Sequence, residues 1–471
     1  MFQQGKMFSV FRSAALTLTA LASSQSYALA AQSDIQSWVT CASKHCVEAP
    51  AISWRTAGSG GGKDVLHVAF DKKKQEILGF GGAFTDAACF TFDNMPEASR
   101  EKLLKQLFLP SEMNLSVSRV CMGSSDYSTH VYSYDDGEPD PEMKRFSIAH
   151  DEKYILPTLK AARKINPDLF ILATPWSPPG WMKPNNSMLG GNMQRKSLGA
   201  YAKYFSKFLN AYESAGVPVQ AVSVQNECDT DQDSRMPACT WPQEYEMDFV
   251  RNELGPTLEK EGSKTKIWII DHNYNLWGRA VDELEGENML KYTGAVAWHG
   301  YVGAPDLMSR VHNAFPSVDM HWTEGGPDYT QTDYASDWSK WAGAFSGILN
   351  NWCKSIIVWN LSLDEVGKPN LGPFPCGGLV TVNAKTKEVS YSGQYWAISH
   401  FSKFIKRGAH VVASNCDDHD LSFVAAENPD GKHVVVATNP GKVAKTVKLE
   451  LGAKEAELHL EPDSVNTFMW N

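Results

Sequence analysis

The 471-residue chain lacks the features that define several broad classes of protein. No apolar run approaches the roughly 18 residues that a membrane-spanning helix needs. Basic residues are in the minority, with 44 Lys and Arg against 54 Asp and Glu, so the formal net charge is −10. Nucleic-acid binding depends on a basic surface that meets phosphates. We therefore expect neither a nucleic-acid partner nor a membrane-spanning helix.

The chain also lacks a complete phosphate loop and a metal-binding motif. The stretch Gly79–Phe84 resembles the dinucleotide-binding pattern G-x-G-x-x-G, but Phe84 stands where the third glycine is needed. We interpret these glycines as close backbone packing. Asp271 and His272 are adjacent, but no third ligand follows at metal spacing, so we expect no metal site.

Aromatic residues are plentiful, and cysteines are present in an odd number. The 15 Trp suggest sugar recognition, because flat rings stack on the C–H faces of pyranoses, although any single Trp is more typical of core packing. The nine Cys cannot all pair. The pairs 41/46 and 228/239 are close enough to close small loops in an exported protein, and the others are typical of buried apolar positions.

The first 30 residues have the composition of an export signal. Lys6 and Arg12 bracket a basic region, residues 14–22 are apolar, and Ala28-Leu29-Ala30 is a small-x-small cleavage site. Met7 is a second candidate start. We expect residues 1–30 to be a signal peptide and the protein to be exported, either to a periplasm or as a secreted protein.

Short β-rich segments alternate with amphipathic helical stretches along residues 76–405. The eight segments are 77–85, 115–123, 170–177, 221–227, 266–273, 294–301, 319–324 and 355–361. Eight strands alternating with helices predict a (β/α)₈ TIM barrel, with an open doubly wound sheet as the main alternative. Six short alternating strands follow in 406–471 and predict an all-β sandwich. Residues 46–70 have strand character, and the segment 31–75 that contains them is expected to join that sandwich.

Two acidic side chains end otherwise apolar barrel strands. Glu227 ends the fourth strand and Glu324 the seventh, so the two should face each other across the barrel mouth. Paired carboxyls suit glycoside hydrolysis, and a separation of about 5–5.5 Å gives retention through a covalent intermediate. For either Glu alone, a salt bridge is an equally good explanation. The pair, with Trp176 and Trp359 on neighbouring strands, favours a sugar site.

Several motifs carry a resemblance to a known family. They are GFGGAFTDA (79–87), SRVCMGSSDYS (118–128), ATPWSPPGWMK (173–183), VSVQNE (222–227), AWHGY (297–301), HWTEGG (321–326), VWNLSLDE (358–365) and ISHFSKFIKRGA (398–409). Together they resemble glycoside hydrolase family 30, in the branch that contains lysosomal glucocerebrosidase. The Gly-Gly that follows Glu324 and the stretches 228–241 and 367–380 depart from the lysosomal pattern, and the stretch 367–380 is more similar to bacterial members.

The resemblance implies roles for individual residues. Glu227 corresponds to the acid/base and Glu324 to the nucleophile. The other matching positions fall into two groups: Asp126, Trp176, Asn226 and Trp359 hold the terminal sugar, whereas Arg119 and His299, with Tyr301 as a neighbour, brace the nucleophile. No cofactor is expected. The mismatched loops shape the leaving-group side of the site, so they leave the aglycone open.

We therefore expect a retaining β-glycosidase of the glucosylceramidase type, acting on a terminal β-glucosyl linkage in a carbohydrate or glycolipid. Such a substrate allows peripheral contact with lipid surfaces. The alternatives are an endo-β-1,6-glucanase, a β-xylosidase-type member of the same family, and an inactive sugar-binding protein on the same fold.

Overall fold

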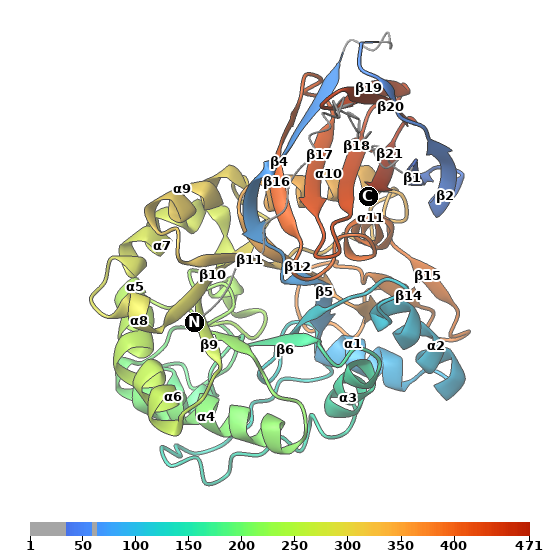
Figure 1. The fold of residues 1–471 in the computed structure, drawn as a ribbon. Helices are drawn as coiled ribbons and strands as arrows, with labels where there is room; N and C mark the ends of the chain where they lie inside the picture. Colours follow the sequence, from blue (N-terminus) through green and yellow to red (C-terminus); the bar gives the residue numbers. More distant parts are fainter. Residues whose placement is uncertain (1–33, 59–63) are drawn as a thin grey trace, which may run out of the picture.

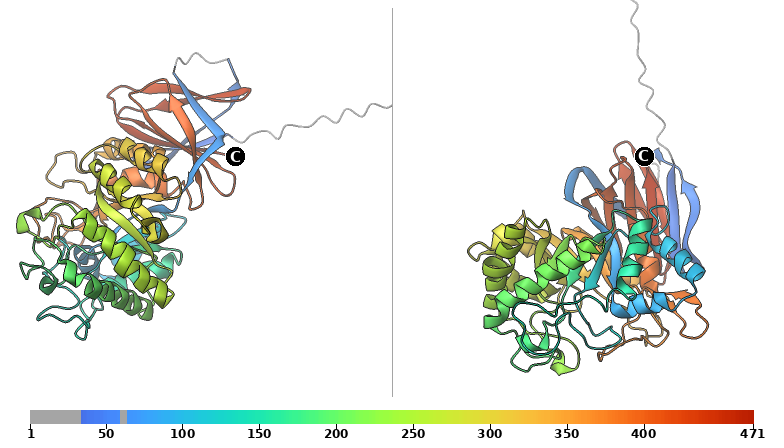
Figure 2. Two further views of the ribbon diagram at one scale, coloured as in Figure 1. Left: turned by 90° about the vertical axis from the view of Figure 1, so that its left-hand side faces the viewer. Right: turned by 90° about the horizontal axis from the view of Figure 1, so that it is seen from below.

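The computed structural model describes residues 34–58 and 64–471. The predicted signal peptide, residues 1–30, lies outside the described residues. The described chain forms a barrel surrounded by helices and an all-β module that stands to one side of it (Figures 1 and 2). Across the described ranges, no helix is both long and apolar enough to cross a membrane.

Eight parallel strands close into a barrel, as the sequence predicted. In chain order they are β5 (Gly79–Phe84), β6 (Val117–Cys121), β7 (Phe170–Thr174), β8 (Ala221–Ser223), β9 (Lys266–Asn273), β10 (Thr293–His299), β11 (Asp319–Glu324) and β12 (Cys353–Asn360). Pairing of β12 with β5 closes the ring, which excludes the open doubly wound sheet. Gly81 is required here, because a Cβ atom at that position would lie 1.6 Å from the carbonyl oxygen of Val117.

Helices surround the barrel because each has one apolar face. In α4 the buried residues Tyr201, Phe205, Phe208 and Tyr212 recur every three or four positions, which puts them on the side facing the strands. The helices are α1 (Asp86–Asp93), α2 (Glu97–Phe108), α3 (Ile155–Ile165), α4 (Leu198–Ser214), α5 (Gln243–Asp248), α6 (Gly255–Glu261), α7 (Trp277–Leu284), α8 (Met289–Tyr292), α9 (Asp306–Ala314), α10 (Trp338–Asn350) and α11 (Gly393–Ser402). A π-helical turn, η4 (Phe249–Leu254), separates α5 from α6.

The β module is built from both ends of the described chain. Its strand order is β2-β1-β21-β18-β17-β16-β4-β19-β20-β3. The carboxyl-terminal strands are β16 (His410–Cys416), β17 (Ser422–Glu427), β18 (His433–Asn439), β19 (Lys445–Leu451), β20 (Lys454–Leu460) and β21 (Ser464–Trp470). The amino-terminal strands are β1 (Ile35–Cys41), β2 (Lys44–Ile52), β3 (Arg55–Thr56) and β4 (Val65–Glu76). The predicted side sandwich is thereby confirmed.

Two features were not expected from the pattern. Strand β1 was missed, although it lies centrally enough to pair with both β2 and β21. The stretch after β12 forms a small sheet of β13 (Ser362–Leu363), β14 (Val380–Val382) and β15 (Val389–Tyr391). All nine cysteines lie in the described ranges and all are free, so neither small loop is closed by a disulfide.

Candidate active site

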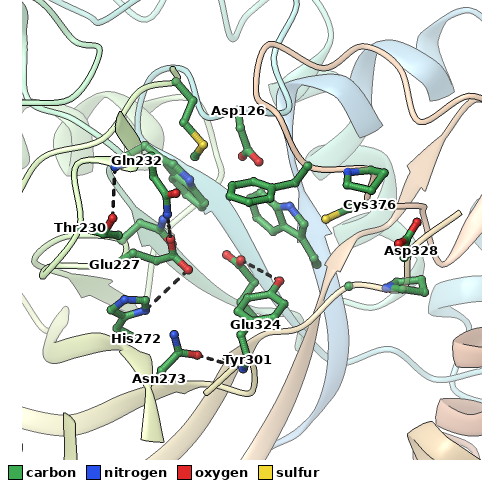
Figure 3. A pocket seen from close by; sticks show the side chains of 18 residues that line it. Asp126, Glu227, Thr230, Gln232, His272, Asn273, Tyr301, Glu324, Asp328 and Cys376 are labelled. Carbon is green, nitrogen blue, oxygen red and sulfur yellow. Dashed lines mark hydrogen bonds and ion pairs between the residues drawn. The ribbon is translucent and has the colours of Figure 1, made fainter. Parts of the chain in front are cut away.

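A pocket of about 500 Å³ opens at the carboxyl ends of the barrel strands (Figure 3). Its lining includes seven of the nine residues that the sequence proposed: Asp126, Trp176, Asn226, Glu227, Tyr301, Glu324 and Trp359. The other two, Arg119 and His299, are fully buried and do not line the pocket, but both contact residues that do. The structure therefore brings all nine residues together.

Glu227 follows β8 at a bend in the backbone. Its φ is +51°, a left-handed conformation, and its N–H donates to the carbonyl oxygen of Asp271 at 3.0 Å. The side chain points into the pocket (Figure 3). Oε1 lies 3.4 Å from Nδ1 of His299 and 3.6 Å from Nδ1 of His272. Oε2 accepts a hydrogen bond from the Gln232 amide at 2.5 Å.

Glu324 is the last residue of β11 and meets different partners. Arg119 Nη1 donates to Oε2 at 2.6 Å, and the Tyr301 hydroxyl donates to Oε1 at 3.1 Å. Nδ1 of His299 lies 3.9 Å from Oε1. One ring nitrogen is thus within 4 Å of both acidic side chains, and the two carboxyl groups face each other across the pocket (Figure 3).

Arg119, on β6, is a fully buried cation beneath the pocket. Besides Glu324, its guanidinium donates to Asn226 Oδ1 at 2.7 Å, to Asp271 Oδ2 at 2.8 Å and to Thr174 Oγ1 at 3.1 Å. It also lies 4.6 Å from the ring centroid of Trp176. A planar, five-donor group can serve several acceptors at once, whereas a Lys ammonium cannot match this geometry.

Asp271 is the functional residue that sequence reasoning missed. Its carboxylate accepts from Arg119, Thr174 Oγ1 at 3.1 Å, Ser223 Oγ at 2.5 Å and Thr323 Oγ1 at 2.6 Å, and it pairs with His299 Nε2 at 3.1 Å. Burial acts to raise the pKa of Asp271, but the Arg119 charge and these hydrogen bonds hold it far below its usual value. The available signal was an acidic side chain near the end of an apolar strand, the same signal that singled out Glu324.

Two tryptophans and an aspartate shape the sugar side of the pocket. The rings of Trp176 and Trp359 stack with centroids 5.0 Å apart. Asp126 is buried, and its Oδ1 has no hydrogen-bond partner among the described residues. Burial and the negative charges of Glu324 and Glu227 raise the pKa of Asp126. An acceptor left open in a pocket is suited to bind a sugar hydroxyl.

The rest of the pocket is lined mainly by residues from loops. These lining residues are Thr230, Gln232, Met236, His272, Asn273, Gly326, Pro327, Asp328, Phe374, Pro375 and Cys376. Most lie in the stretches after β8, β11 and β12, which are the stretches where the chain departs from the lysosomal pattern. Loop residues carry no periodicity, so only the tertiary structure places them at the pocket.

The surroundings of the two acids push their pKa values in opposite directions. Burial and the charge of Glu227 raise the pKa of Glu324 above its usual value, against the nearby cations His299 and Arg119. Burial also acts to raise the pKa of Glu227, but the His299 hydrogen bond and the His272 charge outweigh it and lower this pKa. In this arrangement Glu227 is the more readily ionised acid.

His299 should make protein stability depend on pH. Burial works against its charged ring, but three surrounding carboxylates, Glu324, Asp271 and Glu227, raise the pKa of His299 to about 9. A raised folded-state pKa contributes stability that is complete below the unfolded value of about 6.5 and is lost as pH rises toward 9. We expect His299→Gln to lower the unfolding midpoint most below pH 6.5, with a smaller effect near pH 9.

Thermal unfolding midpoints of wild type and variant between pH 6 and 9 test this expectation. His400→Gln is the matched control, because burial lowers the pKa of His400 to about 3 and that ring is neutral throughout the window. Its effect on the midpoint should not change with pH. A His299→Gln effect that is equally flat would contradict a charged His299.

A parallel barrel with two facing acids in a pocket at its strand ends fits one class of enzyme, the glycoside hydrolases. Residues 77–405 match the glycosyl hydrolase family 30 TIM-barrel domain, and residues 408–468 match the family 30 beta sandwich domain. The chain belongs to glycoside hydrolase family 30, which confirms the resemblance seen in its motifs.

Relatives of the chain are named for different activities. The chain is 33% identical over 428 residues to an endo-1,6-beta-D-glucanase of Neurospora crassa, covering 86% of this chain and 87% of the relative. It is 28% identical to the lysosomal acid glucosylceramidase of Mus musculus, covering 85% and 82%. The solved structure of the endo-beta1,6-glucanase BT3312 superposes with a TM-score of 0.84 at 27% identity, covering 93% of this chain and 100% of that one.

Proposed function

We propose that this glycoside hydrolase is a retaining β-glycosidase in which Glu324 is the nucleophile and Glu227 the acid/base. The observation that carries the proposal is the convergence of both carboxyls on His299, with Nδ1 lying 3.4 Å from Glu227 and 3.9 Å from Glu324. A shared contact atom places the two carboxyl groups close enough to allow the separation of about 5–5.5 Å that retaining enzymes use.

The reaction follows from these positions. Glu324 attacks the anomeric carbon while the bond to the leaving oxygen breaks, and Glu227 gives its proton to that oxygen. Water then attacks the anomeric carbon, Glu227 takes its proton, and Glu324 is released. Because Arg119 occupies Oδ1 of Asn226, the amide nitrogen of Asn226 is the group left for the 2-hydroxyl.

Substrate binding has to reverse the proton preference of the two acids. Gln232 donates to Oε2 of Glu227 and favours its ionised form, whereas an acid catalyst must be protonated when it meets the leaving oxygen. Gln232 lies on the leaving-group side, so an aglycone that displaces its amide would raise the pKa of Glu227. The ion pair with Arg119 can then hold Glu324 as the carboxylate.

We propose a β-1,6-glucan as the substrate. This modifies the expectation from sequence, which favoured a glucosylceramidase, because both the Neurospora crassa relative and a solved structure with high coverage are named as β-1,6-glucanases. Glucosylceramide is the second candidate. It is favoured by the exposed apolar side chains Tyr301, Val302 and Phe374, since Tyr301 and Phe374 line the pocket and would suit a lipid contact. We also propose that the protein is exported.

A substrate screen separates these candidates. The purified chain is assayed against β-1,6-glucan, glucosylceramide in detergent micelles and aryl β-xyloside, with product release followed by chromatography. We expect oligosaccharides from β-1,6-glucan. Preferential release of ceramide would favour the second candidate, and xylose release would favour a xylosidase. Glycan binding without any product between about pH 4 and 8 would indicate an inactive sugar-binding protein.

Removing the acid/base should slow substrates according to their leaving groups. In Glu227→Ala, no proton reaches the departing oxygen, so we expect a fall in kcat/KM of about 10²–10⁴-fold for a β-glucoside with an alkyl leaving group. A dinitrophenyl glucoside needs no protonation and should react with little loss in its first step. Equal losses for the two substrates would contradict the acid/base role.

A further inference from the structure

Two histidines converge on Glu227 at the wall of the pocket in a way that the glycosidase reaction does not explain. Nδ1 of His272 and Nδ1 of His299 lie 3.6 Å and 3.4 Å from the same oxygen, Oε1 of Glu227. The potential ligand atoms of the three residues all lie within 4.8 Å of one another. His272 is buried, yet its Nδ1 has no hydrogen-bond partner among the described residues.

A carboxylate pairs with the Nε2 atom of each imidazole ring, on the side away from Glu227. Nε2 of His272 pairs with Asp229 Oδ1 at 2.7 Å, and Nε2 of His299 pairs with Asp271 Oδ1 at 3.1 Å. Metal binding would release the proton that the raised pKa of His299 keeps on Nδ1 of that ring. With the remaining proton on each Nε2, both Nδ1 lone pairs are free beside Oε1 of Glu227. Metal-binding histidines are oriented in this manner, with the second ring nitrogen donating to a carboxylate.

Two of the three spacings between the ligand atoms suit a tetrahedral ion. Bonds of about 2.0–2.1 Å to nitrogen and oxygen at tetrahedral angles put neighbouring ligand atoms about 3.3 Å apart. The two distances from Glu227 Oε1, 3.4 and 3.6 Å, are close to this value. A set of two histidines and one glutamate, with a fourth position open, is one that zinc ions occupy in proteins.

We propose that Glu227, His272 and His299 form a binding site for a divalent transition-metal ion of the zinc class, with its fourth position open to the pocket. Such an ion would bind Glu227, the proposed acid/base. It would therefore block turnover while it is bound. The site would thus make the enzyme reversibly sensitive to metal, independently of which glycoside it cleaves.

Cobalt serves as the spectroscopic probe, because tetrahedral Co²⁺ gives intense visible absorption whereas the aqueous octahedral ion absorbs weakly. We titrate the full chain with Co²⁺ and expect the tetrahedral spectrum to saturate at one ion per chain. Zn²⁺ should displace the cobalt, and EDTA should abolish the spectrum. An octahedral spectrum only, or no saturable binding, would overturn the proposal without reference to any activity.

Variants assign the ligands. His272→Gln should lose the tetrahedral spectrum, and Asp229→Asn, which only supports His272, should bind about 10–100-fold more weakly. His459→Gln, on the exposed side of β20, and Cys376→Ser, a thiol in the same pocket, should bind as wild type does. Circular dichroism verifies folding of each variant. Unchanged binding by folded His272→Gln, or loss of binding in Cys376→Ser, would show that the ion binds elsewhere.

Where glycosidase activity is present, Zn²⁺ should inhibit the wild type and EDTA should restore it. If His272→Gln retains turnover, that variant should resist Zn²⁺. Zinc inhibition of equal strength in both proteins would contradict the assigned site, whatever substrate is used.

Discussion

Glu324→Ala is expected to lower kcat on an aryl β-glucoside by about four orders of magnitude or more, which is the scale on which losing a nucleophile acts. The physical reason is that this carboxylate forms the bond to the anomeric carbon, and no neighbour can replace it. Arg119 and Tyr301, which hold its two oxygens, are donors without nucleophilic character at neutral pH. Glu112→Ala, at an exposed surface position, is the matched control and should retain wild-type activity.

Azide distinguishes the roles of the two acids, which their pKa directions alone do not settle. Azide fills the space left by the nucleophile in Glu324→Ala and attacks directly, so the product should be the inverted α-glycosyl azide. In Glu227→Ala the covalent intermediate still forms, and azide should give the retained β-glycosyl azide from an activated substrate. Nuclear magnetic resonance identifies the anomers. A β-azide from Glu324→Ala would reverse the assignment, and near-normal activity without azide would exclude Glu324 as nucleophile.

Asp271→Asn is expected to lower the free energy of unfolding by about 3–5 kcal/mol, because it breaks a fully buried ion pair by removing one partner. Every group that contacts Asp271 can donate: Arg119, Thr174, Ser223, His299 and Thr323. An amide NH₂ placed among these donors would leave at least one of them unsatisfied. Arg119 would also lose an anchor, so we expect turnover to fall in the protein that remains folded.

Urea denaturation measures the change, with kcat determined on the folded variant. Asp319→Asn is the matched control, since Asp319 also lies on a barrel strand and pairs with Lys354 at 3.2 Å, but both side chains are partly exposed. That pair should be worth about 0–1 kcal/mol. If both variants lost the same small amount, Asp271 could not be the anchor of the site.

The local sequence pattern was sufficient to predict the barrel and to single out its two acidic residues, Glu227 and Glu324. Each barrel strand is a short apolar run between amphipathic stretches, and Glu227 and Glu324 stand out because they interrupt that apolar character at strand ends. Strand β1 was not predicted, because one of its two pairing partners, β21, comes from the other end of the chain. The sheet β13–β15 was not predicted, because strands of only two or three residues are too short to show an alternating pattern.

The backbone bend at Asp271 could not be predicted from local pattern. The backbone turns left-handed at Ile270 and Asp271, with φ values of +71° and +45°, and Glu246 accepts the N–H of Ile270 at 2.9 Å. β-branched residues rarely adopt positive φ, so nothing in the local sequence announces this bend. At this bend the Asp271 carboxylate contacts side chains from five other barrel strands.

The sequence by itself determined the alternation that closes a barrel, the family, and the identities of the acids at the fourth and seventh strand ends. Those follow from local periodicity and from short motifs. The tertiary structure decided which acid holds a proton more readily, which individual loop residues line the pocket, and how two histidines contact Glu227. These properties depend on distances between groups that are remote along the chain, and electrostatic interactions and metal coordination change steeply with distance.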